Sequence, residues 1–184
     1  MQPQLLALQE ISQFLTKQNV PHFVIGGIAN AIWGRPRATL DADLKILLPL
    51  EHIDPFIEQL GKHFSFRVAD PFSFAQELFV ILLQSSAGVD IDLIIGLLPY
   101  EESAYERMQW LTYEGVKFPV CTAEDLIIHK AISERPQDWL DIEGILQRQQ
   151  DKLDQIYIRQ WLVEFANLLE NPEILSKYDA YLSR

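Results

Sequence analysis

Apolar positions recur along the chain with two periods, one typical of helices and one typical of strands. Residues 3–18 place leucine, isoleucine or phenylalanine every three or four positions, which predicts an amphipathic helix. Similar spacing predicts further helices over 28–33, 51–63 and 103–110. Short apolar runs bounded by turn residues predict strands, and these runs are 22–25, 41–48, 78–84 and 88–95. Ser-Ser-Ala-Gly between the last two predicts a hairpin, and 111–121 predicts another about Glu114-Gly115.

The pattern is helical from residue 122 onward. Thr122-Ala-Glu-Asp125 predicts a capped helix start, and that helix continues through residue 132. Arg135-Pro136 ends it, and a second helix follows to about residue 147. After a polar connection, an apolar stripe over 158–169 predicts a third helix. We therefore predict an α+β fold, with a mixed α/β core over 1–120 whose mixed sheet is flanked by helices, and a helical C-terminal part over 121–184 packed on that core.

Composition and charge narrow the class of partner. The chain has 184 residues and is 48% apolar, so it can bury a substantial core. Fifteen basic against twenty-six acidic residues give a net charge of −11. Proteins that grip nucleic acid through many phosphate contacts normally present a basic surface. Stable non-specific nucleic-acid binding is therefore disfavoured, whereas a small anionic ligand accompanied by metal ions fits the charge.

Cysteine usage and the N-terminal segment indicate the compartment. Cys121 is the single cysteine, so the chain has no internal disulfide framework and no cysteine-rich zinc site. Met-Gln-Pro-Gln lacks the basic start and apolar core of a signal peptide. No apolar run approaches the roughly 18 residues that span a bilayer. We expect a soluble cytoplasmic protein without membrane association.

The candidate chemistry lies in two Asp-x-Asp pairs. On a strand over 41–48, alternation places Asp41 and Asp43 on one face, roughly 6–7 Å apart. Two like charges so close repel unless cations or arginines lie between them. In enzymes of phosphoryl or nucleotidyl transfer, two Mg²⁺ ions about 3.5–4 Å apart usually neutralise such a pair. Asp90 or Asp92, on another apolar strand, would supply the third carboxylate.

Other known motifs that use similar residues do not match this sequence. A calcium-binding EF-hand beginning at Asp41 would need glycine and glutamate where Ile46 and His52 stand. The glycine-rich part lacks Gly-Lys-Ser/Thr of a P-loop, and no Gly-x-Gly-x-x-Gly occurs. A haloacid-dehalogenase phosphatase would carry its Asp-x-Asp near the N-terminus. Gly26-Gly27, between a strand and a helix, lets backbone N–H groups approach a triphosphate, although a tight packing turn is the alternative.

Taken together, these motifs resemble the nucleotidyltransferase superfamily of DNA polymerase β type, and most of all its small AbiEii-like or minimal nucleotidyltransferase proteins. That family has a strand, Gly-Gly or Gly-Ser, a short helix and Arg-x-Thr-x-Asp-x-Asp. Here these are Gly26-Gly27 and Arg37-Ala-Thr39-Leu-Asp41-Ala-Asp43. The family's third acid matches Asp92 best, with Asp90 as a substitute.

The resemblance extends downstream to about residue 145. The family often carries Glu-Asp-Leu, a helical lysine and Arg-Pro-Lys-Asp followed by Asp, and the matching positions here are Glu124-Asp125-Leu126, Lys130, Arg135-Pro136-Gln137-Asp138 and Asp141. Gly-Gly replaces the commoner Gly-Ser, and Gln137 replaces a basic residue. The resemblance implies that Asp41, Asp43 and Asp92, with Asp90 as a further ligand, hold Mg²⁺ or Mn²⁺. Gly26, Gly27, Arg37, Thr39 and Lys130 would then contact the nucleoside triphosphate.

Lys130 has two interpretations at this stage. It lies among apolar residues of a mostly buried helix, where a lysine needs an anion. That anion is either a nucleotide phosphate or an acid such as Asp138 or Asp141.

The function that follows is metal-dependent transfer of a nucleoside monophosphate from an NTP to an acceptor hydroxyl on a small molecule, protein or RNA. The resemblance also includes toxin-type enzymes with an antitoxin-like protein partner. Two alternatives remain: a non-catalytic nucleotide- or partner-binding domain of the same fold, and a metal-dependent phosphohydrolase.

Overall fold

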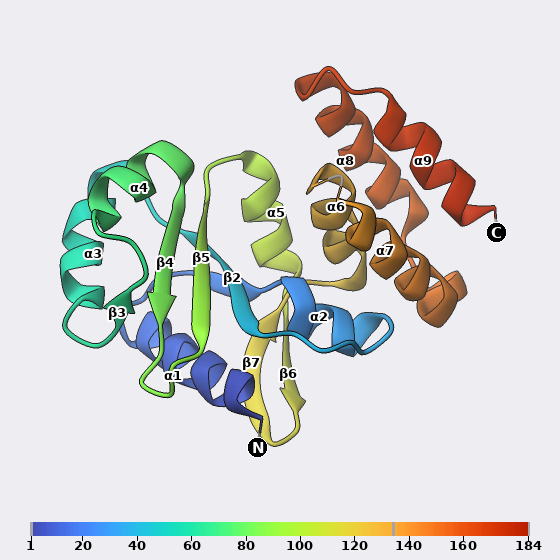
Figure 1. Cartoon of the computed structure of the whole chain (residues 1–184). Helices are drawn as coiled ribbons and strands as arrows, with labels where there is room; N and C mark the ends of the chain where they lie inside the picture. Colours follow the sequence, from blue (N-terminus) through green and yellow to red (C-terminus); the bar gives the residue numbers. More distant parts are fainter. Residues whose placement is uncertain (1, 134, 184) are drawn as a thin grey trace. The chain divides into compact units, whose positions relative to one another are not determined.

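The computed structural model describes residues 2–133 and 135–183 and combines helices with one mixed sheet (Figure 1). The strands are β1 (His22–Val24), β2 (Asp41–Leu47), β3 (Ser65–Phe66), β4 (Val80–Gln84), β5 (Asp90–Gly96), β6 (Gln109–Tyr113) and β7 (Val116–Val120). The α-helices are α1 (Pro3–Lys17), α2 (Gly26–Trp33), α3 (Ile53–Leu60), α4 (Pro71–Leu78), α5 (Pro99–Arg107), α6 (Ala123–Ser133), α7 (Pro136–Gln149), α8 (Gln155–Leu168) and α9 (Glu173–Leu182). Short 3₁₀ helices are η1 (Leu50–His52) and η2 (Gln150–Lys152).

The described residues form two compact units. The first, the sheet unit, contains residues 2–28 and 38–121, and the second, the helical unit, contains residues 29–37 and 122–183. The expected division near residue 120 had assigned 29–37 to the first part. These residues pack with the helical unit because α7 binds their backbone. Arg148 Nη1 donates to the carbonyl of Gly34 at 2.8 Å, and Gln149 Nε2 donates to that of Trp33 at 2.7 Å.

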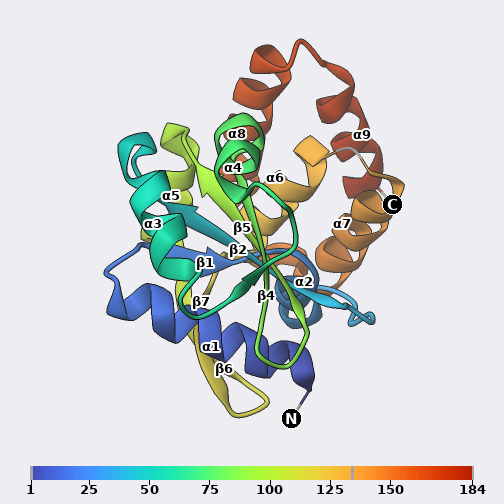
Figure 2. The same cartoon turned by 60° about the vertical axis from the view of Figure 1, so that its left-hand side comes forward.

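The sheet of the first unit has the strand order β3-β4-β5-β2-β1-β7-β6. The pairs β2–β5 and β1–β7 are parallel and the others are antiparallel. Alternate side chains of the central strands are fully buried, as the alternating pattern predicted: Ala42, Leu44, Ile46, Ile91 and Leu93. Helix α1 packs along β2, β5 and β7 (Figure 2). The other alternate positions of β2 and β5 are half-buried and carry the aspartates.

Local turn chemistry explains several boundaries. The β6–β7 hairpin turns at Glu114 and Gly115, both with positive φ (48° and 85°), as the sequence predicted. The strand expected from residue 78 begins at Val80 instead, because α4 occupies the preceding residues. Asp70 caps that helix by accepting from the N–H groups of Phe72 and Ser73 at 3.2 and 3.1 Å. Helix α5 likewise begins four residues earlier than expected, at Pro99.

The helical unit contains the three expected C-terminal helices and also α9, which the apolar pattern did not predict. Buried Tyr178 fixes α9 by donating its hydroxyl proton to Gln155 Oε1 at 2.6 Å. Trp139 of α7 stacks on Tyr181, with ring centroids 5.6 Å apart. Throughout the described part of the chain, no helix has both the length and the apolarity required to span a bilayer.

Candidate active site at the paired aspartates

The two Asp-x-Asp pairs lie on neighbouring strands in matching register. In the parallel β2–β5 pair, Asp41 is opposite Asp90 and Asp43 is opposite Asp92. Strands in a sheet are about 4.8 Å apart, and in-register neighbours project from the same face. The four side chains therefore form two rows on one face, at the start of both strands. The four carboxylates repel one another, so nearby positive charge stabilises this arrangement.

The glycine pair lies directly against this motif. Gly26 has a φ of +62°, and a Cβ there would lie 1.9 Å from Oδ2 of Asp43. A Cβ at Gly27 would lie 2.4 Å from Oγ1 of Thr39. Any larger residue would displace the carboxylate or the hydroxyl. The Gly-Gly and Thr-x-Asp-x-Asp segments, more than ten residues apart in sequence, are thus in direct contact.

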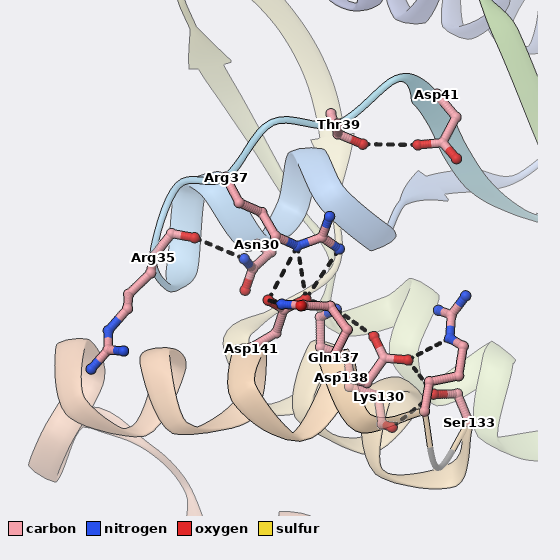
Figure 3. Close-up of polar contacts among 11 residues, drawn as sticks. Asn30, Arg35, Arg37, Thr39, Asp41, Lys130, Ser133, Gln137, Asp138 and Asp141 are labelled. Atoms are coloured by element: carbon pink, nitrogen blue, oxygen red, sulfur yellow. Dashed lines mark hydrogen bonds and ion pairs between the residues drawn. The ribbon is translucent and has the colours of Figure 1, made fainter.

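Thr39 positions the first aspartate. Its hydroxyl donates to Oδ1 of Asp41 at 2.8 Å (Figure 3). The carbonyl of Thr39 accepts from Nε2 of Gln4 on α1 at 3.0 Å. The segment that leads into β2 is therefore held at both backbone and side chain, and Asp41 enters the strand with a fixed orientation.

Arg67 holds the other row. Its Nη1 donates to Oδ2 of Asp90 at 2.6 Å, and its Nη2 donates to Oδ1 of Asp92. Gln84 Nε2 also donates to Asp90, at 3.3 Å. Sequence reasoning missed Arg67, which follows the two-residue strand β3. A single arginine in a short alternating segment carries no periodic signal, and its proximity to β5 depends on long-range strand pairing.

Burial and the neighbouring charges shift the pKa of Asp92. Burial raises the pKa of the Asp92 carboxyl above its ordinary value, and the negative charges of Asp41 and Asp90 raise it further. Arg67 opposes both effects through its charge and hydrogen bond. Asp92 is therefore a half-buried acid whose charged form is favoured by a nearby cation.

Searches by sequence found no match: no family model and no curated protein matches the chain. Solved structures do match. An antigenic nucleotidyltransferase-like protein from Paracoccidioides brasiliensis aligns with a TM-score of 0.54 and 18% identity, over 96% of this chain and 92% of that one. The antibiotic-resistance factor ANT(2'')-Ia aligns with a TM-score of 0.57 and 17% identity, over 92% and 95%. The chain has the nucleotidyltransferase fold. A lincosamide antibiotic adenylyltransferase, LnuA, shares the fold with a TM-score of 0.50 and 15% identity, over 76% and 94%.

The donors that this nucleotidyltransferase fold presents suit a hard divalent cation. In the described part of the chain, no three His, Cys, Asp or Glu side chains converge as ligands on one point. Asp90 and Asp92 hold Arg67 instead, and Asp41 accepts from Thr39. Carboxylate oxygens are nevertheless the ligands that Mg²⁺ and Mn²⁺ prefer, and the two in-register rows supply four carboxylates on one face. The chemistry of the donor set therefore fits such an ion.

Lys130 and Arg37 belong to the helical unit of this nucleotidyltransferase fold, where both contact Asp141 (Figure 3). Buried Lys130 donates from Nζ to Oδ1 of Asp138 at 2.9 Å and to Oδ2 of Asp141 at 2.6 Å. Arg37 donates from Nε and Nη2 to Asp141 at 3.2 Å. Of the two anions considered for Lys130, the structure supplies the acids, so its burial requires no nucleotide phosphate.

Further donors complete an ion cluster, in which the buried side chains of Lys130, Asp138 and Asp141 meet the exposed side chains of Arg37 and Arg135. Ser133 and Arg135 donate to Oδ2 of Asp138, and Gln137 donates to Oδ1 of Asp141 at 3.1 Å. Burial by itself would raise the pKa of both acids, but these hydrogen bonds and the Lys130 charge hold each pKa below its ordinary value. Both acids are therefore stabilised as carboxylates.

Proposed function

We propose that this protein is a metal-dependent nucleotidyltransferase that moves a nucleoside monophosphate from an NTP to an acceptor hydroxyl and releases pyrophosphate. The observation that carries the proposal is the in-register pairing of Asp41-x-Asp43 with Asp90-x-Asp92 on one face of the sheet. The contact of this motif with Gly26-Gly27 supports it, because the triphosphate has to approach the carboxylates closely. The fold shared with nucleotidyltransferases supports it independently.

Each side chain has a distinct role in this proposal. Asp41 and Asp43 would hold Mg²⁺ or Mn²⁺, and Asp92 would bind one of the ions and favour loss of the acceptor hydroxyl's proton. When bound, such ions neutralise charge on the triphosphate and lower the pKa of a coordinated hydroxyl. The backbone at Gly26 and Gly27 would receive the triphosphate. The acceptor oxygen then forms a bond to the α-phosphorus as the bond to pyrophosphate breaks.

A small-molecule acceptor fits the chain better than a large RNA, because a net charge of −11 opposes extended phosphate contacts. Two proteins of the same fold are named for adenylyl transfer to small molecules: LnuA, a lincosamide adenylyltransferase, and ANT(2'')-Ia, captured with adenylyl-2''-tobramycin. A protein acceptor, as in a toxin-type enzyme with an antitoxin-like partner, is the second acceptor class to test.

The test uses NTPs labelled at the α- or γ-phosphate, with Mg²⁺, Mn²⁺ or EDTA and panels of hydroxyl-bearing antibiotics, cellular proteins and total RNA. Transfer of α-label with release of pyrophosphate supports the proposal. Release of free phosphate would instead indicate a phosphohydrolase, and nucleotide binding without turnover would indicate a non-catalytic domain. Asp41→Asn and Asp92→Asn should abolish transfer. Asp179→Asn, at an exposed ion pair of the helical unit, is the matched control and should retain it.

A further inference from the structure

Arg67 reaches the aspartates from the edge of the sheet. Its backbone N–H donates to the carbonyl of Leu82 at 3.0 Å, and Leu82 is the register partner of Asp92. The backbone of Arg67 is therefore fixed level with Asp92 along the strands. The side chain is one-quarter exposed, and its guanidinium donates to both Asp90 and Asp92. A cation that is part of the chain thus holds two of the four carboxylates.

The two acids held by Arg67 differ in their other surroundings. Asp90 has a second donor in Gln84, and its side chain is 41% exposed. Asp92 is 28% exposed, lies in register with Asp43 and senses the charge of Asp41. Asp90 can therefore keep a guanidinium bond in water-accessible surroundings, whereas Asp92 lies among the acids that would bind metal.

We propose that Arg67 is a built-in competitor for the metal: it occupies Asp92 in the metal-free protein and withdraws to Asp90 alone when a divalent cation binds. This inference rests on the proposed function. It assigns Asp92 as the third metal ligand and Asp90 as the residue that retains Arg67. Arg67 acts through these acids, so it is a positioning residue that sets metal affinity.

The competition follows from charge and from donor geometry. A planar guanidinium that donates from two nitrogens to two carboxylates makes strong charge-assisted bonds, and a divalent cation on Asp92 must break one of them. Losing such a bond costs enough free energy to lower metal affinity by about tenfold. In exchange, the arginine balances the acids before metal arrives, so the metal-free fold tolerates four neighbouring carboxylates.

The experiment is a titration of the full-length, nucleotide-free protein with Mn²⁺, followed by electron paramagnetic resonance and by calorimetry. Arg67→Gln should bind Mn²⁺ about tenfold more tightly than the wild type. It should also melt at a lower temperature without metal and regain that loss in saturating Mn²⁺. Arg159→Gln is the matched control, since it breaks an ion pair of the helical unit, and should match the wild type in Mn²⁺ affinity.

A second variant guards against misfolding of the first. Arg67→Lys keeps one positive charge but cannot donate to both acids in a planar fork, so its Mn²⁺ affinity should lie between those of the wild type and Arg67→Gln. Asp92→Asn should lose the tight site, whereas Asp90→Asn should keep it.

The outcomes separate this inference from the function on which it rests. Equal or weaker Mn²⁺ binding by both arginine variants, with metal-dependent transfer intact, overturns the role of Arg67 and leaves the proposed function standing. Absence of Mn²⁺ binding in the wild type and in every variant overturns both. Tight binding that survives Asp92→Asn but not Asp90→Asn reverses the assignment of the two acids and refutes the inference.

Discussion

Replacing Lys130 by methionine tests whether the ion cluster stabilises the fold or binds the nucleotide. The substitution keeps the apolar stem and removes the charge from a residue that is 4% exposed. Asp138 and Asp141, with side chains 2% and 4% exposed, then lose a shared partner. Leaving a buried charge without its partner costs about 3–5 kcal/mol. Because Arg135 and Arg37 still reach these acids, we expect a loss at the lower end, about 3 kcal/mol.

The variant should also change how stability depends on pH. In the folded protein the pKa values of Asp138 and Asp141 are held below their ordinary value, against the effect of burial. The stability that they contribute is therefore complete above the unfolded-state pKa of about 4 and is lost as pH falls through the lower folded pKa. Without Lys130, the folded-state pKa of both acids rises, so the variant should lose less stability than the wild type as pH falls below about 4, and the difference between the two proteins should narrow.

Urea unfolding followed by tryptophan fluorescence, at neutral pH and through a series down to about pH 2, measures both effects. For a chain of this size, about 3 kcal/mol corresponds to a melting temperature lower by about 6–12 °C. Lys152→Met, at an exposed position of η2, is the matched control and should unfold like the wild type. A Lys130→Met protein of wild-type stability whose affinity for MgATP falls tenfold would refute this reasoning and assign Lys130 to the nucleotide.

Three further outcomes follow from the geometry. Gly26→Ala should destabilise the protein more than Gly88→Ala in urea unfolding, since both positions have positive φ but only the first meets a side chain, that of Asp43; equal losses would show that the clash relaxes. Asp43→Asn should leave the melting temperature of the metal-free protein unchanged or slightly raised and abolish Mg²⁺-dependent nucleotide binding, whereas a large loss without metal would indicate a structural carboxylate. Burial raises the pKa of Tyr178 to about 12, so the stability it contributes should fade between the unfolded value of about 10 and pH 12. Ultraviolet titration of Tyr178→Phe beside the wild type measures the ionisation of this tyrosine. If the variant lacks a tyrosine that ionises near pH 10, instead of one that ionises near pH 12, the prediction is wrong.

The aspartate rows show what sequence alone can predict. Alternation is a local property of a strand, so Asp41 and Asp43 could be placed on one face without any knowledge of the sheet. The match of Asp41 with Asp90 depends on the pairing of β2 with β5, which are more than forty residues apart. Apolar alternation fits several registers equally well. The fold class and the motif segments were thus predictable, whereas the registration of the two rows was not.

The missed features have specific causes. Helix α4 is signalled by Asp70-Pro71, a capping residue followed by proline at the first helical position, but phenylalanines on a short helix hide its periodicity. Arg67, which follows β3, reaches the aspartates of β5 because β3 pairs with β4 and β4 pairs with β5. No local sequence pattern contains these pairings. Residues 29–37 follow Gly26-Gly27 in sequence, yet long side chains of α7 bind their carbonyl groups. Such donors are equally common on solvent-exposed helices.

The placement of residues 29–37 has a consequence for any attempt to divide the protein. The chain passes from one unit to the other between residues 28 and 29, 37 and 38, and 121 and 122, so the units are interleaved in sequence. A truncation at residue 121 would still carry 29–37 but would remove the donors of Arg148 and Gln149. In the severed product these carbonyls would lose their side-chain donors and bind water instead, so the connection that leads into the aspartate strand would lose contacts that order it. Expression of either unit alone would therefore need a circularly permuted or co-expressed design. A single cut in the chain does not separate the two units, so neither can be moved to another protein by simple fusion.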